Sequence, residues 1–295
     1  FPRLFLCFSY AFPMLFYAFA MLSLRFSRKR EMANLKEIRN RITSVGSTMQ
    51  ITSAMKMVSA AKLKKAQDAI TAMRPYSDKL TELLQSLSAT LDADSGSKFA
   101  NQREVKKVLI VPITSNRGLA GAFNSNIIKQ VNTLVATTYA NQEVSFLVLG
   151  KKANDAFKKS NKVIANKSAI YDDLTFDNVA EIAELLMDKF ISGEFDKVEL
   201  VYNKFKNAAT QEVMTEQFLP IVPVANDANV NLDYIFEPSK VEIVEQLIPK
   251  SLKTQLFKAI RDSFASEHGA RMTAMHKATD NATELRDQLK LTYNK

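Results

Sequence analysis

Two long segments, one at each end of the chain, contain almost none of the residues that end helices. Residues 33–74 hold no proline and one glycine, Gly46, and residues 250–295 hold no proline and one glycine, Gly269. As helices, these segments would extend about 60 Å and about 65–70 Å. Because a compact domain needs no helix of that length, the sequence favours an antiparallel coiled coil with one arm from each end. A pair of ordinary core helices is the alternative.

Each segment carries an apolar stripe with the three- and four-residue steps of a helix face. The stripe of the first comprises Leu35, Ile38, Ile42, Val45, Met49, Met55 and Val58, after a start that Asn34 can cap. The stripe of the second comprises Leu252, Leu256, Ala259 or Ile260 and Ser263, then the smaller Ala265, Ala270, Ala274 and Ala278. Small side chains let two helices approach closely. We assign the amino-terminal arm to residues 32–90 and the carboxy-terminal arm to 240–295.

The middle of the chain alternates strand-like and helix-like segments. Strands are predicted at 106–113, 144–149, 163–165 and 197–205, helices at 125–139, 151–160 and 177–191, and extended edge pieces at 212–219 and 221–224. Alternation of this kind favours a largely parallel sheet with helices on its faces. The predicted fold is therefore α/β: a Rossmann-like domain at 105–225 and a long two-helix coiled coil formed by both termini.

The net charge of +9 is unevenly distributed. Residues 32–74 carry eight basic and two acidic residues and residues 250–295 carry nine and five, whereas residues 75–249 are mildly acidic. A basic segment is attracted to an acidic partner, which could be nucleic acid, anionic lipid or an acidic protein surface. Few aromatic residues interleave with these charges, which weakens a single-stranded nucleic-acid interpretation.

Residues 1–31 are rich in phenylalanine and leucine and end in a basic cluster. Three interpretations compete: a signal anchor, an organelle-targeting segment, or upstream sequence joined to a start at Met32. We favour the last, because a helix-forming sequence begins at Met32, and we leave this extension out of the predicted fold. Its Cys7 is the single cysteine of the sequence, so an internal disulfide is excluded.

Residues 114–124 (TSNRGLAGAFN) follow a predicted strand and precede a predicted helix, where a phosphate-binding loop would lie. They match neither GxGxxG nor GxxxxGK[ST], so we interpret them as a tight turn with Asn124 or Ser125 as the helix cap. His268 and His276 are expected to face solvent. Without a GxSxG motif or a metal-ligand pattern, the residues predict no catalytic site, cofactor or metal.

Several segments resemble, in order along the chain, the gamma subunit of F-type ATP synthases. They are residues 35–67 (LKEIRNRITSVGSTMQITSAMKMVSAAKLKKAQ), 74–76 (RPY), 115–124 (SNRGLAGAFN), 202–213 (YNKFKNAATQEV), 234–239 (YIFEPS) and 265–295. The resemblance runs from Met32 to the last residue and includes the signatures of both terminal arms.

This resemblance implies a central rotor shaft that couples proton-driven rotation of a membrane c-ring to ATP synthesis or hydrolysis. The two arms would pair inside a hexamer of alternating alpha and beta subunits, and the central domain would lie with the epsilon subunit on the c-ring. Chemistry would belong to beta, so a non-catalytic subunit with no cofactor and no nucleic-acid partner is expected. Its expected place is the cytoplasmic face of a bacterial inner membrane, with the mitochondrial inner membrane as the alternative.

Motif alignment and charge select five positions as contacts with the alpha/beta ring: Arg39, Met55, Lys56, Lys62 and Arg271. In the family, a basic replacement at the position of Met55 perturbs coupling.

The chain also departs from the family pattern. Ala120 replaces a cysteine that many relatives have, and the chloroplast redox insertion is missing between Phe195 and Val230. The family's last helix continues about 30 Å past this end at helical rise, so the chain looks truncated. From the residues alone, an independent α/β nucleotide-binding enzyme and a basic coiled-coil nucleic-acid binder stay open.

Overall fold

The computed structural model describes residues 8–88, 98–99, 102–160, 162–221 and 240–295. Its elements are α1 (Phe8–Ser88), β1 (Lys107–Pro112), α2 (Phe123–Ala136), β2 (Glu143–Val148), α3 (Lys151–Phe157), η2 (Lys158–Ser160), β3 (Val163–Asn166), η3 (Ser168–Tyr171), α4 (Phe176–Ile191), β4 (Lys197–Phe205), β5 (Gln211–Leu219) and α5 (Lys240–Asn294). The chain forms two compact units, Phe1–Ala54 with His276–Lys295 and Met55–Met275. Both long helices therefore contribute to both units.

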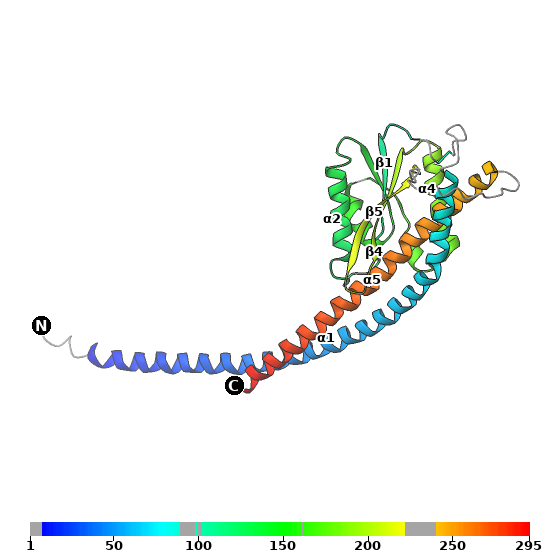
Figure 1. The fold of residues 1–295 in the computed structure, drawn as a ribbon. Helices are drawn as coiled ribbons and strands as arrows, with labels where there is room; N and C mark the ends of the chain where they lie inside the picture. Colours follow the sequence, from blue (N-terminus) through cyan, green and yellow to red (C-terminus); the bar gives the residue numbers. More distant parts are fainter. Residues whose placement is uncertain (1–7, 89–97, 100–101, 161, 222–239) are drawn as a thin grey trace. The chain divides into compact units, whose positions relative to one another are not determined.

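The unit Met55–Met275 contains a five-stranded sheet in the order β3-β2-β1-β4-β5 (Figure 1). The first four strands are parallel, and β5 pairs antiparallel with β4 at the edge. In this register, Leu109 of β1 lies between Ser145 of β2 and Val198 of β4. The prediction of a largely parallel sheet with an extended edge piece is thus confirmed.

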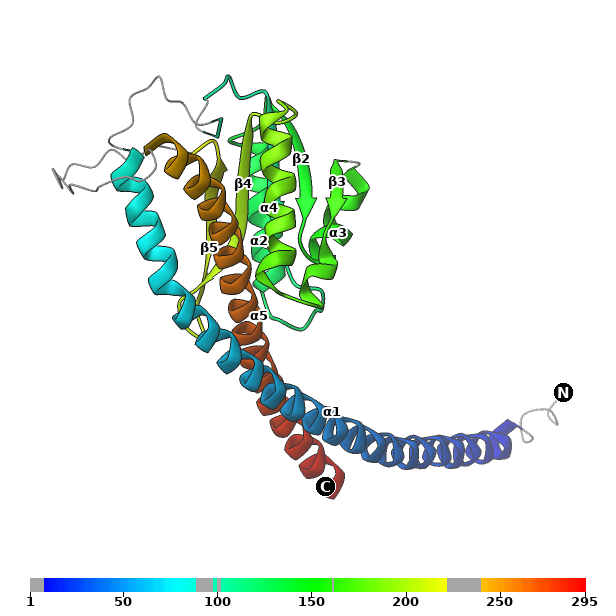
Figure 2. The same cartoon turned by 90° about the vertical axis from the view of Figure 1, so that its right-hand side faces the viewer.

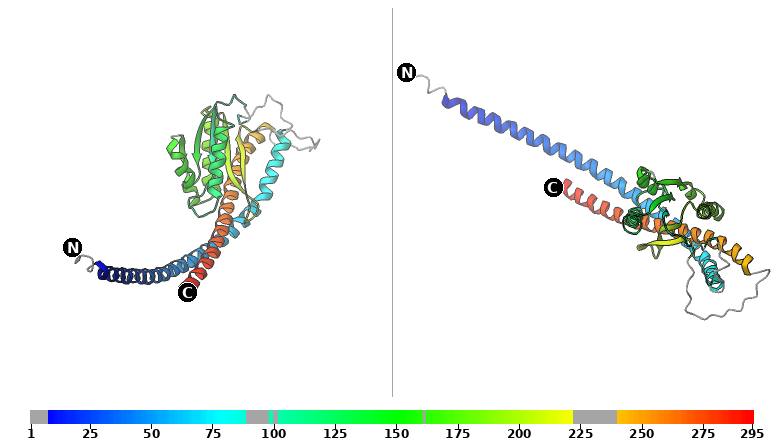
Figure 3. Two further views of the ribbon diagram at one scale, coloured as in Figure 1. Left: turned by 90° about the vertical axis from the view of Figure 1, so that its left-hand side faces the viewer. Right: turned by 90° about the horizontal axis from the view of Figure 1, so that it is seen from above.

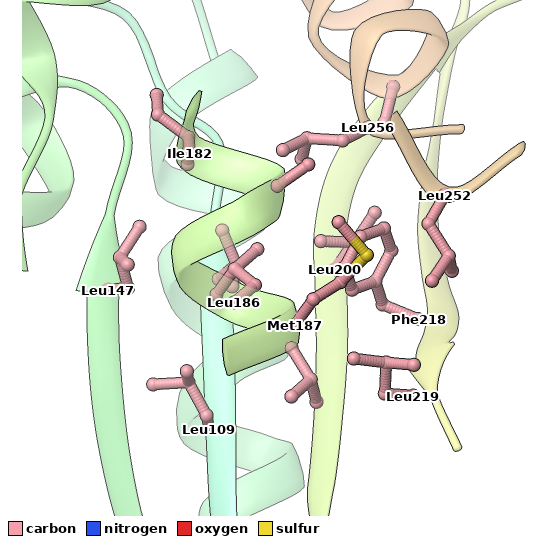
Figure 4. Close-up of a cluster of buried hydrophobic side chains, with 14 of the residues drawn as sticks. Leu109, Leu147, Ile182, Leu186, Met187, Leu200, Phe218, Leu219, Leu252 and Leu256 are labelled. Atoms are coloured by element: carbon pink, nitrogen blue, oxygen red, sulfur yellow. The ribbon is translucent and has the colours of Figure 1, made fainter. Parts of the chain in front are cut away.

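Helices cover both faces of the sheet. Alternate residues of β1 point to opposite sides, so Leu109 and Val111 join one buried cluster while Val108 and Ile110 join the other. On the first face, α4 packs beside the first half of α5, with Leu186 and Leu256 fully buried (Figures 2 and 4). Figure 4 also shows Leu252 and Met187 turned toward the side chains of β4 and β5. Burying one such side chain contributes roughly 1.5–3 kcal/mol.

Three details of the local predictions are wrong. Helix α1 begins at Phe8, so Asn34 lies inside a helix and caps nothing; residues 14–45 contain neither proline nor glycine to stop it. The residue that caps α2 is Ala122, and its side chain makes no cap hydrogen bond. Ile221 lies outside any strand, and the rest of the piece at 221–224 lies outside the described residues. Within the described ranges, no helix is long and apolar enough to cross a membrane.

Candidate functional site: the paired terminal helices

In the smaller unit, the two ends of the chain form an antiparallel helix pair. Three contacts set the register. The hydroxyls of Thr52 and Thr279 lie 2.8 Å apart, the Arg286 guanidinium donates to the Met49 sulfur at 3.5 Å, and the Arg39 guanidinium lies 5.8 Å from the centre of the Tyr293 ring. As the α1 numbers rise the α5 numbers fall, as the predicted antiparallel coiled coil requires.

The buried side of α1 follows a seven-residue repeat. Positions at alternating steps of three and four along this side are all buried or half-buried: Ile42, Val45, Met49, Thr52, Lys56, Ser59, Leu63, Ala66, Ile70, Met73, Ser77 and Leu80. This spacing is the seam of a coiled coil. The predicted stripe coincides with this repeat from Ile42 to Met49. Outside that range Leu35 is 44% exposed, and Val58 is 58% exposed because the seam continues through the polar Thr52 and Ser59.

In the larger unit, the second half of α1 packs against α5. Leu63, Ala66 and Ile70 bury themselves with Ala265 of α5, and Met272 packs at the margin of this cluster. In both panels of Figure 3, the middle of α1 lies next to α5 beside the α/β domain. Phe205 and Ala208, at the turn between β4 and β5, close the cluster on the side of the sheet.

The first half of α5 is a core helix, so the alternative of core packing is right for this part of the arm. Ile248, Leu252, Leu256, Ala259 and Ile260 belong to the buried cluster beneath α4, and Ala270 belongs to the cluster on the other face. Beyond Met275, α5 belongs to the helix pair of the smaller unit. One helix thus combines the two roles that the sequence presents as alternatives.

Polar side chains of α5 hydrogen-bond to backbone carbonyls around the carboxyl ends of the strands. We call this set of contacts the α5 seat. The donors are Arg261 to Leu174 O (3.0 Å), Ser263 to Ile113 O (3.4 Å), Ser266 to Asn203 O (3.0 Å), Arg271 to Arg117 O and Gly118 O (3.3 Å each), and Thr273 to Ala208 O (3.2 Å). Ile113 follows β1 and Asn203 lies in β4, so the seat spans both strands.

This position is where a doubly wound sheet usually receives its ligand. In such sheets, ligands bind beyond the carboxyl ends of the strands, where the strand order reverses. Here the reversal lies between β1 and β4, because the chain passes from β1 outward through β2 to β3 and returns to β4. Gly269 allows the close approach of α5, since a Cβ atom there would lie 3.1 Å from the Ala208 carbonyl oxygen. Helix α5 itself therefore occupies the usual ligand position.

The seat contains a buried ionic cluster. Arg271 is 7% exposed, and its Nη2 lies 2.7 Å from Glu267 Oε1 one turn earlier. Burial raises the pKa of Glu267, and the Arg271 charge partly offsets this rise. A buried guanidinium whose donors lack partners would be strongly destabilising. The hydrogen bonds from Arg271 to Arg117 O and Gly118 O therefore help to stabilise the buried pair.

His268 does not face solvent as predicted; it is 5% exposed. The edge of its ring meets the Phe264 ring at a centroid distance of 4.5 Å, and Arg271 Nη1 lies 3.4 Å from its Nδ1. Burial lowers the pKa of His268 to about 4, and the charges of Arg271 and Lys62 act in the same direction. At neutral pH the imidazole is therefore uncharged and its Nδ1 accepts from Arg271. His276 is exposed as predicted and lies 3.2 Å from Asp280.

The lowered pKa of His268 predicts an acid-dependent loss of stability. Below its unfolded pKa of about 6.5 the unfolded chain binds a proton that the folded chain, with a pKa near 4, excludes. Stability is thus fully present above about pH 6.5 and falls as the pH drops toward 4. Between pH 7 and 5.5 we expect a loss of about 1 kcal/mol from this group. Urea unfolding followed by circular dichroism at both values measures it.

His268→Gln should remove this pH dependence, and His276→Gln, at an exposed position of the same helix, should keep it. The window ends at pH 5.5 because Glu267, whose pKa is raised, gains protons in the folded state at lower pH and opposes the effect. If His268→Gln lost as much unfolding free energy between pH 7 and 5.5 as the wild type does, His268 would not be the cause of the pH dependence.

Known proteins match this chain along most of its length. The family model described as ATP synthase covers residues 34–295. A curated protein of Flavobacterium psychrophilum, named ATP synthase gamma chain, is 72% identical over 265 residues, covering 90% of this chain and 92% of that protein. The chain belongs to the ATP synthase gamma-chain family. A gamma chain of Flavobacterium johnsoniae is 71% identical with the same coverage.

Solved structures share the fold of this gamma-family chain. A rotor chain of the Euglena gracilis mitochondrial ATP synthase has a TM-score of 0.61 at 22% identity and covers 89% of this chain and 96% of that one. A chain from the central stalk and c-ring of the Tetrahymena thermophila enzyme has a TM-score of 0.58 at 24% identity, with coverages of 77% and 99%. As a gamma-family member, the chain is one component of a membrane-associated ATP synthase complex.

The five positions selected as ring contacts in this gamma-family chain have different surroundings. Arg39 and Lys62 are exposed, and Met55 and Lys56 are half-buried on α1. Arg271 is buried and its donors are used within the chain. Contact of these residues with other subunits stays a prediction. No pattern in the sequence indicates that Arg271 is buried, although a glutamate four residues before an arginine on one helix is a recognisable pairing signal.

A second polar cluster, which sequence reasoning missed, joins the turn after α2 to β4 in the larger unit. Tyr139 donates to the buried Glu199 at 2.5 Å, and Lys197 Nζ lies 2.8 Å from the same carboxylate oxygen. Burial, with the Glu199 hydrogen bond, raises the pKa of Tyr139 to about 12. Perturbed groups of this kind also occur in active sites, but these residues lie at the amino-terminal end of β4, opposite the ligand side of a parallel sheet.

Proposed function

We propose that this chain is the central rotor shaft of a proton-translocating F-type ATP synthase. Rotation of a membrane c-ring would turn the α/β domain and the helix pair together, and the asymmetric pair would drive the conformational changes of the beta subunits that make or hydrolyse ATP. Family membership supports this assignment, and the observation that carries it is the antiparallel pairing of residues 39–52 with 279–293. Through this pairing, the two segments form an antiparallel helical rod, which is the form that a shaft requires.

The proposed partners are an alpha/beta ring around the helix pair, and an epsilon subunit and c-ring at the α/β domain. Residues 32–74 and 250–295 carry the basic excess, so acidic surfaces of the ring would meet them through ion pairs. Exposed pairs contribute only roughly 0–1 kcal/mol each and exchange partners easily. Weak contacts of that kind allow a shaft to turn. We place the complex at the cytoplasmic face of a bacterial inner membrane.

We further propose that the subunit is non-catalytic, with nucleotide chemistry in beta. The α5 seat supports this, because helix α5 lies at the position where a doubly wound sheet would bind a nucleotide. Purification of the chain from its source lysate decides among the candidates. A shaft co-purifies with alpha and beta subunits, an independent enzyme hydrolyses nucleotide alone, and a nucleic-acid binder shows affinity that falls steeply with salt.

Met55→Lys is expected to slow coupled turnover. Met55 is half-buried beside Lys56 on α1, so a second ammonium there would add an ion pair with an acidic surface of the ring. One exposed ion pair, worth up to about 1 kcal/mol, slows a step that must break it by up to about fivefold. Proton-driven ATP synthesis in inverted membrane vesicles measures the effect.

Met57→Lys is the matched control, because it adds the same charge two residues further along α1, at a position that is 65% exposed and was not selected as a ring contact. Equal rates for the wild type and Met55→Lys would show that Met55 is not a bearing contact.

A further inference from the structure

Helix α5 is fixed to the α/β domain by polar contacts with separate parts of the fold. Its side chains reach the end of β1, the loop after it, β4, the β4–β5 turn and the loop before α4. Apolar burial is non-directional, so it specifies the angular position of a helix less sharply than hydrogen bonds do. Hydrogen bonds have narrow distance and angle requirements, so donors along several turns of α5 resist both motions.

The contacts of Arg271 are the most demanding in the α5 seat. Its Nε and Nη2 both lie within 3.4 Å of Gly118 O, Nη2 also reaches Arg117 O, and Glu267 Oε1 lies 2.7 Å from the same Nη2. Arg117 and Gly118 belong to the loop that joins β1 to α2, in which Leu119 has a positive φ of 61°. A planar guanidinium with several donors fixes direction in a way that a lysine ammonium cannot.

We propose that the α5 seat transmits torque from the α/β domain to helix α5, and that Arg271 is its positioning residue. This inference rests on the proposed shaft function. Helix α5 runs without interruption from Lys240 to Asn294, so a torque applied to the α/β domain enters the helix at the seat and continues along it. Arg271 acts through the β1–α2 loop and touches no substrate.

The test uses the assembled complex with its alpha/beta ring held on a surface and a probe attached to the α/β domain. Arg271→Lys keeps the charge and removes the fork, and Thr273→Val removes the hydroxyl that bonds to Ala208 O while keeping the side-chain shape. Lys250→Ala, at an exposed position of α5, is the control. Angular fluctuation of the probe reports stiffness, and amide hydrogen exchange of residues 115–121 reports the hold on the loop.

For Arg271→Lys we expect about tenfold faster exchange in residues 115–121, because hydrogen bonds to a charged donor are lost, and about twofold larger angular variance as the loosened seat samples additional positions. Thr273→Val should also increase the variance, and Lys250→Ala should change neither quantity. Wild-type variance in both seat variants would overturn the proposal, as would unchanged exchange in Arg271→Lys. If the wild-type chain fails to assemble with the ring, the shaft function itself is wrong, which is a separate outcome.

Discussion

Gly150→Ala is expected to destabilise the α/β domain by at least about 3 kcal/mol, which is a large share of a typical net stability of about 5–15 kcal/mol. Gly150 stands between β2 and α3 with φ at +114° and ψ at 140°, a conformation that side chains with a Cβ atom rarely adopt. A Cβ atom there would lie 2.2 Å from the Thr114 carbonyl oxygen and 2.6 Å from its carbonyl carbon. Neither backbone strain nor this collision can be relieved by moving a flexible side chain.

The neighbouring strand ends cannot separate to make room. The Thr114 amide donates to Leu149 O at 2.7 Å, and its hydroxyl accepts from the Ala153 amide at 2.9 Å. Separating β1 from β2 would break these bonds in a site that is fully buried at Thr114. Unexchanged amides in β1 and β2, counted by hydrogen-exchange mass spectrometry, and the urea midpoint both report the loss.

Gly46→Ala is the matched control for this prediction. Gly46 lies within α1, and a Cβ atom there meets nothing within 4 Å. Alanine is a better helix former than glycine by about 1 kcal/mol, so the same substitution should leave the protein unchanged or slightly more stable. Equal effects of the two substitutions would contradict the close approach at Gly150.

The order of elements in the α/β domain could be predicted because each strand is a short apolar run between polar turns. Residues 197–205 coincide with β4, and the ends of β1 and β2 differ from prediction by one residue. The coiled-coil register was only partly predictable. Its seam passes through Thr52 and Ser59, which an apolar stripe omits, although a strict seven-residue spacing from Ile42 to Leu80 would have selected them.

The parts of the site that escaped prediction depend on contacts between distant segments. His268 lies in the middle of α5, in a stretch rich in small and polar residues. Its burial depends on contacts such as those with Phe264 and Arg271. The cap of α2 failed for a similar reason. Asn124 Oδ1 accepts from the Ser115 amide at 3.0 Å, so it stabilises the loop before the helix and not the helix start. Neither contact leaves a periodic signal.

The second large effect is expected for Leu256→Ala, which tests whether the first half of α5 is part of the core. Leu256 is fully buried in the cluster beneath α4, and α5 would be a peripheral arm if this packing did not hold it. Large-to-small substitutions of buried leucine cost about 2.7–5 kcal/mol, since they lose apolar contact and leave a cavity. The chain contains no tryptophan, so urea unfolding is best followed by far-ultraviolet circular dichroism together with amide exchange in β1 and β4.

Leu285→Ala on the same helix supplies the comparison. Leu285 is 42% exposed in the smaller unit, so its truncation loses little buried area and gains helix propensity, for a net change within about 1 kcal/mol. In Leu256→Ala, amides of β1 and β4 should lose protection together with those of α5, because the helix and the sheet share one core. If Leu256→Ala destabilised the protein no more than Leu285→Ala, the polar seat alone would hold α5. The conclusion that apolar packing also attaches α5 to the domain would then be wrong.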